Sequence, residues 1–123
     1  MIKEKKVKPL LSLDLLAPGA KSELEDCETL DLGKVATLAL TVRLRYHPSA
    51  TQPVKVHLIT SPDGSVWDTQ DYADFTVALE AGKEVQKTVP VTADIFYLKV
   101  QVENLDTTYP VSDIDVFAVL GYE

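Results

Sequence analysis

His47 and His57 are the only histidines in the 123-residue chain, so they are the only candidates for an imidazole general base. Nucleophilic catalysis would place one of them beside an activated serine or cysteine, but no serine lies in a nucleophile-elbow motif. The five glycines form no phosphate-binding loop. The single cysteine, Cys27, can form neither an internal disulfide nor a zinc site by itself, and we expect a buried thiol. These features favour a protein that is not an enzyme and that needs no cofactor.

The elements that must position these side chains are strands, because hydrophobicity alternates with a period of two along most of the chain. From Val35 to His47 the even-numbered positions are apolar or aromatic, and most odd-numbered positions are polar. The same alternation recurs in four later runs: Val54 to Leu58, Phe75 to Leu79, Phe96 to Val102 and Ile114 to Leu120. Weaker strands are expected at Val7–Leu15, Leu24–Leu32, Val66–Thr69 and Val85–Val91. No segment shows a sustained helical period.

Eight or nine alternating strands predict an all-β fold, an antiparallel two-sheet β-sandwich, because each sheet needs a second apolar face to cover its own. A jelly roll is the favoured topology, although periodicity alone leaves immunoglobulin-like connections open. We expect a frayed N-terminus at residues 1–6 and a single β-sandwich domain at residues 7–123.

Charge and hydropathy restrict the partners. The net charge of −7 argues against nucleic acid or an anionic membrane as a partner. No apolar run reaches the length of a membrane span. Pro9 and Asp14 interrupt the leucine-rich N-terminal segment, which argues against a cleaved secretion signal. The sequence therefore predicts a protein made in the cytoplasm.

A hairpin between the two long strands would bring several basic side chains together on one face. If Pro48–Gln52 is a hairpin loop, the two flanking strands pair and His57 lies opposite Arg43. The two histidines would then lie about 13 Å apart at about 3.3 Å per residue, too far to share a metal ion. The same register predicts an outward-facing basic ribbon, consisting of Arg43, Arg45, His47, Lys55 and His57. Acidic segments of the protein would offset this charge, and an anionic partner is the alternative.

The segment SPDGSVWDT, from Ser61 to Thr69, places the only tryptophan three residues after an Asp-Gly turn. As a sugar platform, Trp67 would stack on a pyranose ring beside Tyr72, with Asp68 or Asp71 accepting hydrogen bonds from hydroxyl groups. As a structural residue, it would cover the open end of the core, and this is the favoured interpretation. Asp63 and Asp68 are also candidates for a structural calcium ion, although the loop lacks EF-hand spacing.

SPDGSVWDT resembles the S-x-D-G-x-x-W hairpin of discoidin-type, galactose-binding-like jelly rolls. The stretch YLKVQVENLDTTYPVSDIDVFAVLGY resembles small jelly-roll modules of phage structural proteins, in which a strand of this form precedes a polar turn and a last apolar strand. The first resemblance implies ligand binding by loops at one end of the sandwich, and the second implies a place in a particle. Discoidin-type domains often carry a cysteine pair that this chain lacks, which argues against a secreted lectin.

The last strand is apolar on both faces, because Phe117 and Val119 alternate with Ile114, Val116, Ala118 and Leu120. Its outer face needs a cover, which the N-terminal segment with Leu10 and Leu16 or a second subunit would supply. We therefore expect a homo-oligomer or assembly partner, with Phe117, Val119 and Tyr122 at the subunit interface. The predicted function is a non-enzymatic structural or adhesion module of a phage-like particle or of another multiprotein assembly. In a phage-like particle, the protein would be located in the virion. The alternative is a carbohydrate-binding module that uses Trp67.

Overall fold

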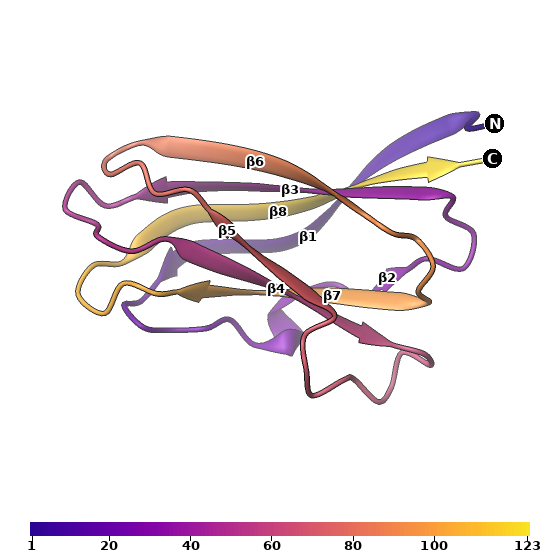
Figure 1. Cartoon of the computed structure of the whole chain (residues 1–123), viewed down its shortest axis with the longest axis horizontal. Coiled ribbons are helices and arrows are strands. Elements are labelled where there is room, and N and C mark those ends of the chain that lie inside the picture. The colour runs from indigo at the N-terminus through magenta and orange to yellow at the C-terminus, as the bar shows by residue number, and fades with distance from the viewer.

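The strands form two antiparallel four-stranded sheets that face each other across one apolar core (Figure 1). The computed structural model describes all residues from 1 to 123. One sheet, sheet A, has the order β1-β8-β3-β6, and the other, sheet B, has the order β2-β7-β4-β5. The elements are β1 (Glu4–Leu16), the 3-10 turn η1 (Leu24–Asp26), β2 (Leu30–Asp31), β3 (Thr37–Tyr46), β4 (Val54–Ser61), β5 (Ala73–Val77), β6 (Glu84–Val91), β7 (Tyr97–Asn104) and β8 (Val111–Tyr122).

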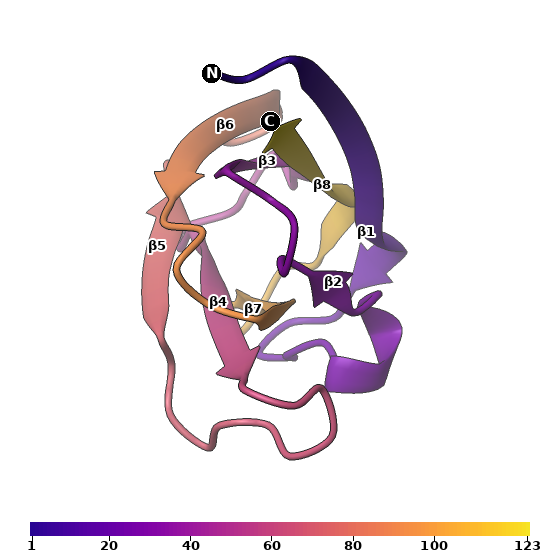
Figure 2. The ribbon, with the colours of Figure 1, turned by 90° about the vertical axis from the view of Figure 1, so that its right-hand side faces the viewer.

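The connections make this sandwich a jelly roll. Every connection crosses from one sheet to the other except that between β4 and β5, which stays within sheet B. Seen from the end, the two sheets lie one above the other, with β5 beside β6 on one side and β1 beside β2 on the other (Figure 2). The structure thus confirms the β-sandwich and decides the topology that periodicity left open.

Alternation places the predicted apolar residues in the core. In β3, Leu40, Val42 and Leu44 have no exposed surface, and the inward aliphatic residues of β4, β7 and β8 are at most 4% exposed. Because side chains at successive positions of a strand point to opposite faces, these residues form one cluster between the sheets. The only helical element is the three-residue turn η1, and no helix is long and apolar enough to cross a membrane.

Four local expectations differ from the structure. β1 begins at Glu4, so residues 4–6, which we expected to be frayed, pair with Leu120–Tyr122. The expected strand Leu24–Leu32 is replaced by η1 and the short β2, because the Glu23 and Cys27 N–H groups bond locally to the Asp26 carboxylate and the Leu24 carbonyl.

Two further differences lie at the ends of strands in sheet B. Residues 66–69 form no strand. Phe96 precedes β7 and is 62% exposed instead of facing the core. In both places the chain leaves the ladder at a turn, so the alternation of apolar residues no longer dictates which side chain faces inward.

Candidate functional site

The outer face of sheet A carries two consecutive rows of small or apolar side chains that cross all four strands. In antiparallel sheets, directly paired residues share a face, so the registers define these rows. One row consists of Val7, Val119, Ala39 and Pro90, and the next of Pro9, Phe117, Thr41 and Thr88. We call the apolar members of these rows, Val7, Pro9, Ala39, Pro90, Phe117 and Val119, the Phe117 patch.

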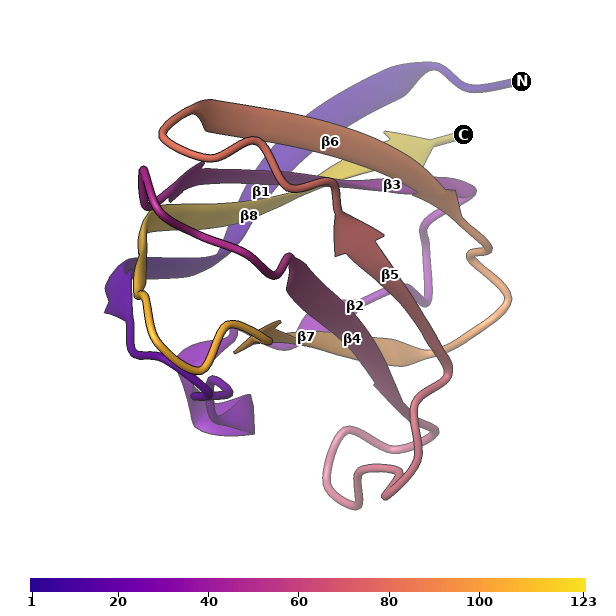
Figure 3. The same ribbon diagram turned by 60° about the vertical axis from the view of Figure 1, so that its left-hand side comes forward.

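The Phe117 patch is open to solvent. Val7 is 65% exposed, Pro9 and Pro90 are exposed, and Phe117 and Val119 are half-buried. Intrachain cover by the N-terminal segment, one of the two expectations, is wrong. Leu10 and Leu16 are buried in the core, because β1 pairs beside β8 as the edge strand instead of crossing the face (Figure 3).

Polar residues border the patch on the side nearer the β3–β4 connection. Ser12 Oγ donates to the Asp115 carboxylate at 2.9 Å, and Arg43 Nε donates to Gln86 Oε1 at 3.0 Å. The Arg43 guanidinium carbon also lies 5.6 Å from the centre of the Phe117 ring, which is a cation-π geometry. At the other border, Lys5 pairs with Gly121. The apolar rows therefore lie between a cationic edge and a mixed charged edge.

Tyr122 does not belong to the Phe117 patch. Gly121 shares the outer face with Thr37, so alternation turns Tyr122 toward the inner side, where it packs against the core cluster. The grouping of Phe117, Val119 and Tyr122 on one surface is therefore wrong, whereas the placement of Phe117 and Val119 on the outer face is confirmed.

The SPDGSVWDT segment forms a turn that side-chain oxygens hold together. Asp63 Oδ1 accepts hydrogen bonds from the Val66 and Ser65 N–H groups at 2.9 Å, and these bonds lower the pKa of the Asp63 carboxyl. Ser61 Oγ accepts from the Gly64 N–H and donates to the Val66 carbonyl. Asp-Gly therefore serves the backbone geometry here, with Gly64 at a φ of 77°.

Trp67 lies half-buried beside Lys99, whose Nζ is 5.4 Å from the ring centre. The same ammonium donates to the Leu24 carbonyl, so it joins the loop, β7 and η1. Lys99 pairs with Ile59, and its side chain lies on the face of sheet B opposite to the inward Leu98 and Val100. Trp67 therefore lies by the outer face of sheet B and not over the open end of the core, where the structural interpretation placed it.

The four residues predicted to bind a sugar do not form one site. Thr60 Oγ1 donates to the Asp68 carboxylate at 2.7 Å, and the Asp71 carboxylate lies 2.6 Å from His57 Nδ1. Tyr72 lines a cleft on the inner side of sheet B, whereas Trp67 lies by the outer face. The carboxylates that were expected to accept sugar hydroxyls thus already accept protein hydrogen bonds.

The calcium candidates Asp63 and Asp68 are likewise engaged within the loop, by the turn N–H groups and by Thr60. No group of three or more histidine, cysteine, aspartate or glutamate side chains lies in a metal-binding arrangement. Cys27 is free and buried, and burial raises the pKa of its thiol.

The prediction of a basic ribbon is wrong, because Pro48–Gln52 is not a hairpin loop. The chain crosses there from β3 in sheet A to β4 in sheet B, so Arg43 and Arg45 lie on one outer face while Lys55 and His57 lie on the other. Arg45 lies 3.8 Å from the Glu84 carboxylate. His47 stacks on Tyr109 with ring centres 4.5 Å apart. Alternation cannot distinguish a hairpin from a crossing of sheets, because both reverse the strand direction.

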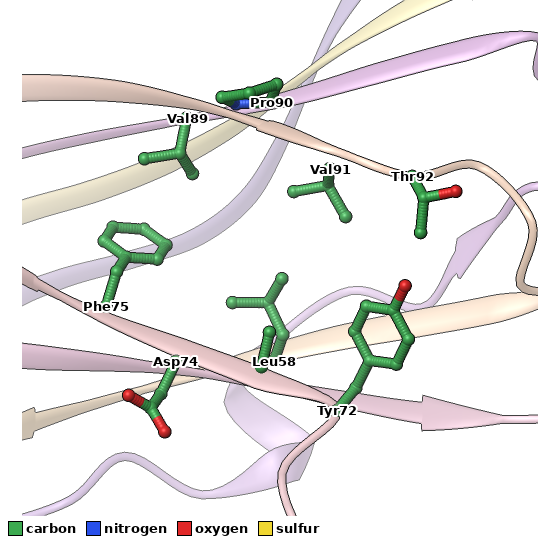
Figure 4. Close-up of a pocket in the computed structure, with 9 residues that line it drawn as sticks. Leu58, Tyr72, Asp74, Phe75, Val89, Pro90, Val91 and Thr92 are labelled. Atoms are coloured by element: carbon green, nitrogen blue, oxygen red, sulfur yellow. The ribbon is translucent and has the colours of Figure 1, made fainter.

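Two features were not found from the sequence. An apolar cleft of about 260 Å³ opens between the edge strands β5 and β6, where Tyr72, Phe75 and Leu58 point toward Val89 and Val91 (Figure 4). No sequence signal marks it, because its walls belong to different sheets.

The second feature joins three loops at one end of the sandwich, and one of its bonds runs from the Gly19 N–H to the Asp106 carbonyl. The buried Asp106 carboxylate accepts hydrogen bonds from the Thr51, Thr108 and Tyr109 N–H groups, which hold the pKa of this carboxyl well below its usual range. Asn104, which has no exposed surface, donates to the Tyr109 carbonyl and accepts from the Asp106 N–H. Asp106 and Asn104 thus serve to hold loops together.

Neither a protein-family model nor a curated protein sequence matches the chain. Solved structures do match it in fold. The PBSX exported protein XepA has a TM-score of 0.60 at 18% identity over 96% of this chain and 37% of that protein. A protein of the T13 IBDV viral particle has a TM-score of 0.55 at 14% identity, and the match covers 98% of this chain and 32% of that protein.

A structure described as CBM4 has a TM-score of 0.50 at 14% identity over 87% of this chain and 67% of its own. The chain thus spans about a third of the length of the first two proteins. At these identities the matches show the fold alone. The resemblance to the jelly rolls of phage and virus particles is confirmed at that level, and a carbohydrate-binding module shares the fold.

Proposed function

We propose that this chain is a non-enzymatic structural module of a phage-like particle or comparable multi-subunit assembly, and that it associates with a second copy of itself through the Phe117 patch. The observation that carries the proposal is the pair of apolar rows on a sheet face that nothing in the chain covers. Burying such rows against another sheet removes apolar surface from water, which is the main driving force of association.

A second copy fits this face by symmetry. A two-fold axis that runs along the rows, between the Val119 row and the Phe117 row, packs each row on the other row of the partner. The same axis brings the Lys5 edge of one copy over the Ser12 and Asp115 edge of the other, so ammonium and carboxylate groups approach each other around the apolar centre. Face-to-face sheet packing at about 10 Å is the geometry that the interior of the sandwich already uses.

Support for a particle component comes from the fold, because a protein of a viral particle shares it. The carbohydrate-binding alternative has weaker support. CBM4 shares the fold, but one side of the Trp67 indole is occupied by Lys99, and Asp68 and Asp71 already accept hydrogen bonds from this chain.

Molar mass by light scattering coupled to size exclusion tests the proposal. We expect a dimer or larger oligomer in the wild type, and a monomer with an unchanged circular dichroism spectrum in Phe117→Glu, because burying a carboxylate in an apolar contact opposes association. Thr76→Glu, which adds the same charge to the outer face of sheet B, should keep the wild-type mass. A wild-type monomer across the accessible concentration range would refute association through this patch.

A further inference from the structure

His57 is a buried histidine that lies between two carboxylates. It points outward from β4 on sheet B, its side chain is only 8% exposed, and Nδ1 lies 2.6 Å from an Asp71 carboxylate oxygen. Nε2 lies 2.9 Å from a Glu103 carboxylate oxygen. The two acids come from different places: Asp71 from the loop of residues 62–72 and Glu103 from β7.

The geometry requires two donors on the imidazole ring. A carboxylate only accepts hydrogen bonds, and a neutral imidazole carries one N–H group, so it can satisfy either Asp71 or Glu103 but not both. The imidazolium carries two N–H groups and satisfies both acids with charge-assisted bonds. The arrangement in the structure therefore corresponds to the protonated ring.

The charged groups around His57 include both signs. Asp74 is its register partner on β5 and shares the outer face, as Asp71 and Glu103 do. The cations are Lys55, which lies two residues earlier on β4 and pairs with Glu103, and Lys21, which forms an isolated bridge with Glu103. Gln101, the partner on β7, is uncharged. Three carboxylates thus face the ring from β5, β7 and the loop.

We propose that His57 is a pH-sensitive latch that ties the 62–72 loop to sheet B when its ring is protonated. When the ring loses a proton it keeps one of the two acids, and Asp71 is released because it lies in a loop, whereas Glu103 is held in β7. Other bonds hold the middle and the end of the loop, since the Asp68 and Tyr72 N–H groups bond to the Thr60 and Leu58 carbonyls. The latch instead fixes the outer side of the loop through Asp71. Trp67 is half-buried in the same loop, four residues earlier, so its access to solvent reports whether the loop loosens when Asp71 is released.

Trp67 provides the assay because it is the only tryptophan. Acrylamide quenching of its fluorescence measures solvent access, and we expect quenching to increase in one step between about pH 5 and about pH 8, the interval in which histidine side chains change their charge. The matched variants replace each of the two histidines in turn. His57→Gln should remove the step, whereas His47→Gln should keep it, because His47 stacks on Tyr109 away from the loop.

Asp71→Ala is a second variant, which leaves the buried ring in place. It removes the carboxylate that the latch holds, so quenching should stay at the alkaline value of the wild type over the whole interval. A wild-type protein whose quenching is independent of pH, or a step that persists in His57→Gln, would overturn the proposal. The readout is independent of the oligomeric state, so its failure would leave the association through the Phe117 patch untouched.

Discussion

The Tyr46 hydroxyl group joins the two sheets, which makes Tyr46→Phe a sharp test of how the sheets are held together. Tyr46 is 1% exposed and projects from β3 in sheet A. Its hydroxyl group donates to the Val77 carbonyl and accepts from the Val54 N–H at 2.9 Å, at the ends of β5 and β4 in sheet B. Burial raises the pKa of this phenol, so the neutral form is the one that bridges the sheets.

The magnitude follows from the two backbone groups. Tyr46→Phe leaves a buried N–H and a buried carbonyl without their partner, which costs about 1–3 kcal/mol in the free energy of unfolding. With an unfolding entropy of about 2.1 cal/mol/K per residue, 1 kcal/mol corresponds to about 4 °C in a chain of 123 residues. Taking about 2 kcal/mol, the melting temperature should fall by about 8 °C.

Thermal unfolding followed by circular dichroism measures this difference. Tyr72→Phe is the control, because Tyr72 is 42% exposed and loss of its hydroxyl group should change the melting temperature by less than about 2 °C. If Tyr46→Phe also remains within about 2 °C of the wild type, the hydroxyl bridge contributes nothing measurable and the argument from unsatisfied backbone groups is refuted.

Three further outcomes are expected. Asp106→Asn should lower the melting temperature at neutral pH. Because the pKa of Asp106 is depressed in the folded state, its contribution to stability is present above the unfolded pKa of about 4 and is lost as the pH falls further, so the difference in melting temperature from the wild type should narrow in acid. The control Asp14→Asn, at an exposed position, should show no such difference. Gly64→Ala should cost about 1 kcal/mol in denaturant unfolding because of the positive φ, and Gly64→Asn should cost less, since asparagine tolerates this region; equal costs would contradict the backbone explanation. Cys27 should react with a thiol reagent only on unfolding, because the thiol is buried and its pKa is raised; rapid labelling of the native protein would show that the site opens.

Much of the architecture was predictable because alternation is a local property. The inward residues of β3, β4 and β8 were identified from a period of two, and the outward position of Phe117 and Val119 follows from the same parity. Tyr122 follows the same parity as Leu120 and was grouped with the wrong face, whereas Phe96 shows where this reasoning fails. At strand ends and turns the backbone leaves the regular ladder, so the identity of a residue no longer dictates its face.

The sites were less predictable because they depend on pairing. Arg43 and His57 look like neighbours across a hairpin in the sequence, yet they lie on the outer faces of different sheets. Glu103 and Asp71 reach the two nitrogens of His57 from positions 46 and 14 residues away, and no motif connects them. Such constellations arise only when the sheet order is known.

The sequence by itself therefore determined that this protein is an antiparallel β-sandwich, because alternation of apolar residues and the placement of turns are written along the chain. Only the tertiary structure decided the jelly-roll order, the apolar rows around Phe117 and the two carboxylates at His57. The physical reason is that a strand's preference for one face is local, whereas the choice of its neighbours depends on how loops cross between sheets. That crossing minimises the free energy of the whole chain and not of any segment in it.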